Sequence, residues 1–149
     1  YLNRPDATAE TITDGWLHTG DIAYMDEDEF IYLVDRAKEM VLRGGENVYC
    51  AEVESVIFAH EAVAECVVFG VEDERMGEEV GAAILPKPGA TLDIAELRRY
   101  LQGKLSAYKI PRYIWLVESP LPRNANGKVL RAELARLVQS LDAPASGPH

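Results

Sequence analysis

The sequence predicts an α+β fold, in which a short sheet flanked by helices is preceded by a β-hairpin. Two observations lead to this prediction. Short runs of alternating apolar residues, typical of strands, lie between segments whose apolar residues recur at helical spacing. The chain has no internal repeat, and its 149 residues, 48% of them hydrophobic, are enough to build one hydrophobic core.

The N-terminal part is predicted to form a short helix at 5–11 and then the hairpin. In GWLHTGDIAYMDEDEFIYLVD (15–35), apolar residues alternate on both sides of an acidic turn at 26–29. An isolated two-stranded hairpin is only marginally stable in water. Its apolar residues therefore need a surface, either on the domain that follows or in a domain that precedes it.

Strands and helices alternate after a domain boundary around 36–38, where the charged sequence DRAKE interrupts the strand pattern. MVLRGGENVY (40–49) predicts a short strand, a Gly-Gly turn and an extended piece, and AEVESVIFA (51–59) predicts a helix. The compact apolar runs AECVVFGV (64–71) and EVGAAILP (79–86) predict buried strands.

The C-terminal part is predicted to contain two helices and one more strand. DIAELRRYLQGKL (93–105) begins with Asp93 as the N-cap and a glutamate three residues later, a variant of the capping box. YIWLVE (113–118) predicts a strand, VLRAELARLV (129–138) a helix, and the tail 139–149 a disordered segment. The apolar stripes of the two helices are Ile94, Leu97, Leu101 and Leu105, and Leu130, Leu134, Leu137 and Val138.

Charge is unevenly distributed along the chain, whose net charge is −10. Residues 1–35 contain nine acids and one arginine, whereas 98–149 contain nine Lys or Arg and three acids. Nucleic acid is not expected as a partner of so acidic a chain, because phosphate contacts dominate that affinity. The basic C-terminal third can either meet a small polyanion such as a nucleotide or form a solvated basic face.

Several further features narrow the class of protein. Cys50 and Cys66 form no Cys-x-x-Cys pair and indicate two reduced thiols. The three histidines lack metal-ligand spacing, so no metal site is expected. No apolar run approaches the roughly 20 residues that cross a bilayer. The chain begins with Tyr1 and has no basic-then-apolar leader, so we expect no secretory signal, a cytoplasmic location and a fragment of a longer protein.

Lys128, in PRNANGKVLR (122–131), has three possible interpretations. A Walker phosphate loop requires a glycine five residues before the Gly-Lys pair and a hydroxyl residue after it, and Pro122 and Val129 occupy those positions. That interpretation is therefore excluded. Either Lys128 is a surface lysine on a turn before a helix, or it is a mobile cation that is delivered to an active site.

Four motifs occur in one order: HTGD (18–21), VDRAKEMVLRGGENVYCAEVE (34–54), YKIPR (108–112) and PRNANGK (122–128). Together they resemble the C-terminal part of the adenylate-forming enzymes, which include acyl-CoA synthetases, peptide-synthetase adenylation domains and beetle luciferases. The resemblance implies that 1–35 are the terminal strands of a large N-terminal domain absent from this chain. It also implies that 36–138 form a mobile C-terminal lid domain.

The resemblance assigns nucleotide binding to Asp21, Arg36 and Asn47. A carboxylate offers only acceptors, which suits the hydroxyl groups of a ribose, and an arginine offers a rigid fork of donors. The alternatives are a turn-capping aspartate and a surface arginine paired with the acidic hairpin. Lys38 matches the family's hinge, about which the lid domain swings.

The resemblance assigns CoA binding to the glycine turn and to an aromatic-basic segment. Glycines let a backbone turn sharply and approach a ligand closely, although a plain hairpin turn is the alternative. Trp115 and Tyr113 are expected to be core or sheet-face residues. The residues assigned to CoA are Gly44, Gly45, Glu46, Tyr108 and Lys109, with Arg112 beside them.

The resemblance implies that Lys128 contacts the carboxylate substrate and the α-phosphate region of ATP with Mg²⁺ while an acyl-AMP forms. CoA then takes up the acyl group, so the expected full-length enzyme is an acyl-CoA synthetase for fatty or aromatic acids. One alternative is an adenylation domain that loads a carrier protein, and another is a non-catalytic α+β binding module. The chain departs from the family at Cys50, which replaces a usual proline, and at Asn124 and Asn126, which replace a Thr-containing form. The isolated chain is expected to be inactive.

Overall fold

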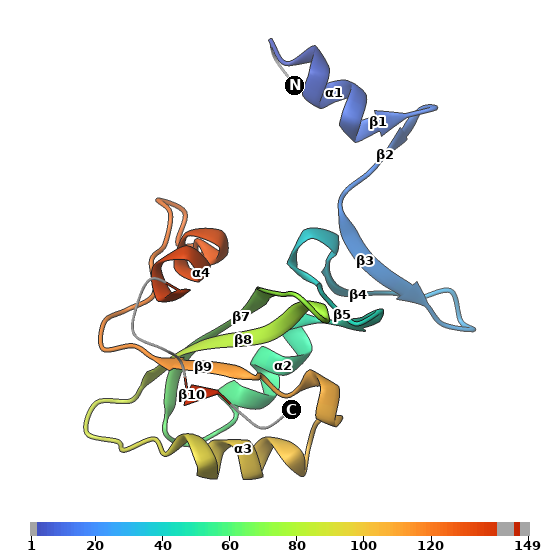
Figure 1. The fold of residues 1–149 in the computed structure, drawn as a ribbon. Helices are drawn as coiled ribbons and strands as arrows, with labels where there is room; N and C mark the ends of the chain where they lie inside the picture. Colours follow the sequence, from blue (N-terminus) through green and yellow to red (C-terminus); the bar gives the residue numbers. More distant parts are fainter. Residues whose placement is uncertain (1–2, 140–144, 147–149) are drawn as a thin grey trace. The chain divides into compact units, whose positions relative to one another are not determined.

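A computed structural model of the chain describes residues 3–139 and 145–146. The chain divides into two compact units, 1–38 and 39–149 (Figure 1). The division falls within the charged sequence DRAKE, where the sequence pattern predicts a domain boundary around 36–38. Each unit is described below by itself.

The first unit contains one helix and two small antiparallel pairs. Helix α1 (Pro5–Thr11) forms at the predicted residues and begins with a proline, which suits the first turn of a helix. It is followed by β1 (Ile12–Thr13) and β2 (Trp16–Leu17). Strands β3 (Asp21–Met25) and β4 (Ile31–Arg36) form the expected hairpin around the acidic turn. None of the residues described in this unit is buried, so the unit builds no core of its own.

The second unit is built on a six-stranded sheet with the order β10-β9-β8-β5-β6, in which β7 also pairs with β8. The two longest strands, β7 and β8, form an antiparallel hairpin, and β9 joins β8 in parallel. The short β5 and β6 form the hairpin expected around the Gly-Gly turn. The strands are β5 (Val41–Arg43), β6 (Glu46–Val48), β7 (Val63–Asp73), β8 (Gly77–Pro86), β9 (Tyr113–Leu116) and β10 (Ala145–Ser146).

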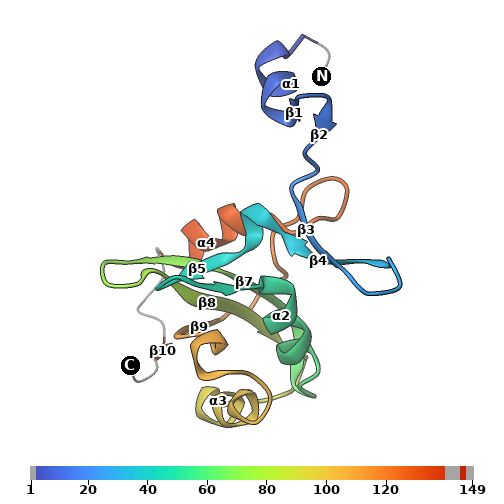
Figure 2. The same cartoon turned by 90° about the vertical axis from the view of Figure 1, so that its right-hand side faces the viewer.

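Helices cover both faces of this sheet (Figures 1 and 2). Along β7 the side chains alternate, so that Val68 packs in the cluster with α2 (Cys50–Phe58) and α3 (Ile94–Gln102). Val67 and Phe69 pack in the other cluster, with α4 (Arg131–Gln139). The second unit is therefore a three-layer α+β domain with a core on each side of the sheet, which confirms the predicted fold class.

The helices form where the sequence predicts them, but α3 ends at Gln102 and α4 begins at Arg131, so Leu105 and Leu130 of the predicted stripes lie outside the helices. The Asp93 carboxylate accepts the backbone N–H of Glu96 at 2.7 Å, which confirms the predicted N-cap of α3. In α4, Leu134 and Val138 are buried, but Leu137 is 52% exposed. The stripe prediction is wrong at Leu137, which lies about 100° around the helix from Val138 and so falls at the margin of the buried face.

Two further predictions concern the tail and the 3₁₀ turns. The prediction of disorder at 139–149 differs from the structure at Gln139, which ends α4, and at Ala145–Ser146, which pair with β9. The other tail residues, 140–144 and 147–149, lie outside the described residues. The 3₁₀ turns η1 (Ala37–Glu39) and η2 (Ala107–Lys109) were not predicted. No helix in the described part of the chain is long and apolar enough to span a membrane.

Candidate functional site

The loop that carries Lys128 is closed by the side chain of Asn124. The Asn124 Oδ1 accepts the backbone N–H groups of Asn126 at 3.0 Å and of Lys128 at 2.9 Å. Gly127 has a φ of +79°, a conformation that favours glycine, and donates its N–H to the Asn124 carbonyl oxygen. The side chain of Asn124 and the turn at Gly127 therefore fix the backbone position of Lys128.

Arg123 ties this loop to the sheet. Its Nη1 donates to the carbonyl oxygen of Gly127 at 3.0 Å, and its Nη2 lies 2.7 Å from Oε2 of Glu65 on β7. Arg123 and Glu65 are 58 positions apart in the chain, and nothing in the local sequence indicates their contact. The base of the loop is thus anchored at two points while its tip remains exposed.

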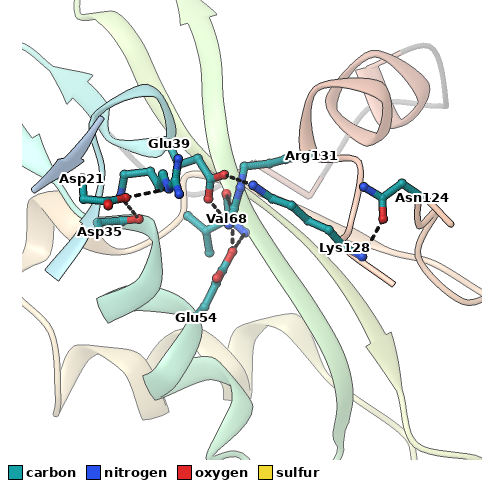
Figure 3. A network of polar contacts seen from close by, with 9 residues as sticks. Asp21, Asp35, Glu39, Glu54, Val68, Asn124, Lys128 and Arg131 are labelled. Atoms are coloured by element: carbon teal, nitrogen blue, oxygen red, sulfur yellow. Dashed lines mark hydrogen bonds and ion pairs between the residues drawn. The ribbon is translucent and has the colours of Figure 1, made fainter. Parts of the chain in front are cut away.

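The ammonium of Lys128 ends on a carboxylate of its own unit (Figure 3). Its Nζ lies 3.0 Å from Oε1 of Glu39, whose Oε2 accepts from Arg131 Nη2 at 3.1 Å. Arg131 Nη1 in turn donates to the Glu54 carboxylate and to the carbonyl oxygen of Val68. The chain of contacts runs from the loop to strand β7, and no local sequence pattern indicates it.

The electrostatics of Glu39 follow from these neighbours. Burial by itself would raise the pKa of the Glu39 carboxyl, but the hydrogen bond and charge of Lys128 and the charge of Arg131 outweigh it. The pKa of Glu39 consequently lies below its ordinary value, and the residue is an anion at neutral pH.

Asp21 and Arg36 face each other across the hairpin of the first unit. They occupy paired positions on β3 and β4, and Arg36 Nε lies 2.7 Å from Asp21 Oδ1. The Asp35 carboxylate accepts the backbone N–H of Arg36 at 2.8 Å. The structure thus brings together two of the residues assigned to the nucleotide, in the ion pair that the surface-arginine alternative describes. Lys38 is exposed in η1, at the last position of this unit.

The glycine turn joins β5 to β6 in the second unit. Gly44 and Gly45 have φ values of +57° and +90°. The N–H of Gly44 donates to the carbonyl oxygen of Met76 at 2.8 Å, whereas a Cβ on Gly45 would meet nothing within 4 Å. Glu46 and Asn47 follow with exposed side chains. One side of the turn is therefore held by the β7–β8 hairpin, and the other side is open.

A basic pocket lies beside this turn. Its volume is about 390 Å³, and the sequence analysis anticipated only the aromatic residue and one of the arginines among the residues that line it. The buried carboxylate of Glu79 in the wall accepts from Arg43 at 2.6 Å and from Arg112 at 3.3 Å, and a third arginine, Arg98, also lines the pocket. The residues that define it are Arg43, Glu79, Arg98, Tyr108, Ile110 and Arg112.

Lys109 is not among the residues that line the pocket, although Tyr108 is. Its Nζ lies 2.7 Å from both carboxylate oxygens of Glu52 on α2. The hydrogen bond that Lys109 donates to Glu52 raises the pKa of Lys109 and keeps it charged. Adjacent residues of YKIPR thus have different surroundings, which a sequence pattern alone does not distinguish. Among the described residues, no group of three His, Cys, Asp or Glu side chains could hold a metal ion.

Residues 52–128 match the family model of the AMP-binding enzyme C-terminal domain. The chain belongs to this family, the C-terminal domains of AMP-dependent synthetases and ligases, which confirms the resemblance of its motifs.

Among curated relatives, the 2-succinylbenzoate–CoA ligase of Geobacillus sp. (strain WCH70) is 47% identical over 138 residues. The match covers 93% of this chain and 28% of the relative. That of Bacillus cereus (strain ZK / E33L) is 45% identical over 141 residues, 95% of this chain and 29% of the relative.

Solved structures give the same result. The o-succinylbenzoate CoA synthetase of Bacillus subtilis, in complex with its acyl-adenylate intermediate, matches with 38% identity and a TM-score of 0.83. The match covers 100% of this chain and 29% of that structure. ATP-bound MatB from Rhodopseudomonas palustris matches with 35% identity and a TM-score of 0.84, over 94% of this chain and 28% of that structure. The chain thus spans slightly more than a quarter of these proteins.

Proposed function

We propose that this chain is the C-terminal part of an ATP-dependent acid–CoA ligase. The observation that carries the proposal is the closed loop of Lys128 in a chain of this family. The loop fixes the backbone of Lys128, while the lysine side chain is 64% exposed. A large N-terminal domain would contribute the acid pocket and the triphosphate site. The exposed apolar residues of the first unit, such as Trp16 and Leu33, would pack against it.

In the first half-reaction, a carboxylate oxygen of the acid attacks the α-phosphorus of ATP. A bond to that phosphorus forms, the bond to the bridging oxygen breaks, and pyrophosphate leaves. Lys128 would offset the repulsion between the acid carboxylate and the triphosphate as they approach. Asp21, beside Arg36, would accept hydrogen bonds from the ribose hydroxyl groups. An ammonium in such a position typically contributes roughly 10²–10³ in rate. Structures of relatives contain ATP and magnesium, and in this protein we assign Mg²⁺ to the ATP phosphates and the N-terminal domain.

In the second half-reaction, the CoA thiol attacks the acyl carbonyl and AMP leaves. Rotation about Lys38 would withdraw Lys128 and present the turn at Gly44 and Gly45, whose open side admits an extended chain. The pocket beside the turn supports this role because it combines an excess of positive charge with Tyr108. Arginine forks suit phosphate groups, and a tyrosine ring suits an adenine.

For the acid, we propose an aromatic carboxylate of the 2-succinylbenzoate type, because the relatives that are 45–49% identical carry that name. A fatty acid is the second candidate, since a fatty acyl CoA synthetase of Mycobacterium tuberculosis matches with 38% identity. A cytoplasmic location remains a prediction.

The test uses the full-length protein that contains this chain. ATP–pyrophosphate exchange with each acid measures the first half-reaction, and AMP release from preformed acyl-AMP with CoA measures the second. Lys128→Ala should lower the exchange by about 10²–10³ and leave the second half-reaction intact. Equal ATP–pyrophosphate exchange in the wild type and in Lys128→Ala would refute the role of Lys128. Thioester formation on a carrier protein but not on CoA would support the rival adenylation domain, and the absence of both half-reactions with every acid would support a binding module.

A further inference from the structure

We propose that Glu39 is a positioning residue that holds the Lys128 ammonium in its own domain until substrate anions displace it. The inference rests on the proposed function, because it gives the lysine a partner that it must leave when the acid is activated. Its basis is the two-sided contact of one carboxylate. Glu39 Oε1 lies 3.0 Å from Lys128 Nζ, and Oε2 lies 3.1 Å from Arg131 Nη2.

The two sides of this carboxylate differ in mobility. On one side, Glu39 contacts Arg131 at the start of α4. Arg131 also donates to Glu54 and to the carbonyl oxygen of Val68, so several contacts hold it in place. The side chains of Arg131 and Glu39 are only 23% and 22% exposed. On the other side, Lys128 is 64% exposed and ends a flexible four-carbon stem. The lysine can therefore leave while the carboxylate stays in place.

Both members of the pair belong to the same unit, which begins at Glu39. Rotation about Lys38 would carry them together, so the swing of the domain does not itself separate them. A competing anion does. Glu39 already shares its charge with Arg131, whereas a carboxylate next to a triphosphate offers several unshared negative charges. Lys128 would accordingly exchange partners when acid and ATP are both present, and return to Glu39 once pyrophosphate has left.

The other carboxylates near the loop have different tasks. Glu54 accepts the backbone N–H of Val68 at 2.7 Å in addition to Arg131, and Glu65 holds Arg123. Among the residues that the structure describes, the ion pair with Glu39 is the only one in which Lys128 takes part. Glu65→Gln therefore gives a matched control, because it removes a carboxylate on β7 that pairs with Arg123 of the same loop and has no contact with the lysine.

The first experiment measures the pair directly, in the full-length protein without substrates. Trace acylation with acetic anhydride, followed by mass spectrometry, gives the reaction rate of Lys128 relative to the exposed Lys87. A held ammonium must leave its contact before it can react, so Glu39→Gln should raise the relative rate about two- to fivefold, the range expected for an exposed ion pair. Glu65→Gln should not change it, and Glu39→Asp, which keeps the charge, should restore a rate near that of the wild type. An unchanged rate in Glu39→Gln would overturn the inference.

The second experiment compares the two half-reactions. In Glu39→Gln the lysine no longer has to leave an anion, so acid activation should rise by about two- to fivefold while transfer from preformed acyl-AMP to CoA stays constant. General damage would instead lower both rates, which would overturn the positioning role. Lysine acylation does not depend on catalysis. A protein that activates no acid but shows the acylation change would refute the proposed function and keep the ion pair, and the reverse result would refute the positioning role alone.

Discussion

Arg43 donates from Nε to the carboxylate of Glu79 at 2.6 Å, and that carboxylate is 1% exposed. Arg112 approaches the other carboxylate oxygen at 3.3 Å. A buried carboxylate requires partners of opposite charge, so the arginines keep Glu79 within the sheet. Glu79 in return fixes Arg43 directly before the turn at Gly44. The pocket and the glycine turn are thereby one rigid structure.

Removing this buried charge should destabilise the protein. Glu79→Gln leaves Arg43 and Arg112 without their shared anion, and we expect the free energy of unfolding to fall by about 2–3 kcal/mol. Denaturant unfolding measures the change. Glu65→Gln is the control, because its partner Arg123 is 45% exposed and such pairs contribute less than about 1 kcal/mol. Similar losses in the two variants would contradict the role given to Glu79.

The basic pocket should affect CoA and not acid activation. Arg98 lines the pocket, and its guanidinium donates to the carbonyl oxygens of Pro111 and Arg112. We expect Arg98→Ala to raise the KM for CoA about tenfold through the loss of a charge-assisted contact, with unchanged ATP–pyrophosphate exchange. Lys109→Ala, outside the pocket lining, should raise this KM less. Steady-state kinetics of the full-length protein decide between the two residues, and a larger effect at Lys109 would support its sequence-based assignment over that of Arg98.

The loop of Lys128 depends on Asn124. Asn124→Ala removes two hydrogen bonds to the loop backbone, so the lysine is no longer pre-positioned, and we expect acid activation to fall about tenfold. Transfer to CoA should persist. Asn126→Ala serves as the control, because at that position the turn uses the backbone N–H. Equal effects of the two substitutions on ATP–pyrophosphate exchange would show that the side chain of Asn124 is not what organises the loop.

The backbone of the glycine turn should not tolerate a side chain at Gly45. Its φ of +90° disfavours any L-residue although the space around it is open, so Gly45→Ala should lower the free energy of unfolding by about 1–2 kcal/mol. Gly103, which ends α3 with a φ of −78°, is the matched control. There alanine should be neutral or stabilising by up to about 1 kcal/mol. Loss of stability at both positions would point to packing and not to backbone strain.

Local sequence patterns were sufficient for the fold. The N-cap at Asp93, the hairpins and the buried strands each depend on residues that are neighbours in the chain. The contacts of the site are different, because Lys128 and Glu39 are separated by 89 positions, and Arg43 and Glu79 by 36. A motif indicates which residues carry chemistry but not which charges surround them.

The same limit explains the individual differences. Lys109 has the residue type expected of an anion-binding group, yet Glu52 on α2 is close enough to bind it. Leu137 continues an apolar stripe at helical spacing, but it lies about 100° around the helix from the buried Val138 and is 52% exposed. Asn124 closes the loop because its side-chain oxygen accepts two backbone N–H groups, a role that the motif alone does not indicate.

The thiol of Cys66 should make the free energy of unfolding fall as the pH rises above 9. Burial, with a smaller contribution from the charge of Glu54, raises the pKa of Cys66 from 9.0 to about 12. The folded state therefore binds the proton more tightly than the unfolded state. The resulting stability is fully present below pH 9 and is lost as the pH rises towards 12, by up to about 1.4 kcal/mol per pH unit.

We expect the difference in free energy of unfolding between the wild type and Cys66→Ala to be constant from pH 6 to 8 and to shrink above pH 9. Urea unfolding at each pH measures it, and taking the difference cancels the titration of lysines and tyrosines common to both proteins. A difference that stays constant up to pH 11 would mean that the thiol ionises as readily in the folded chain as in the unfolded one.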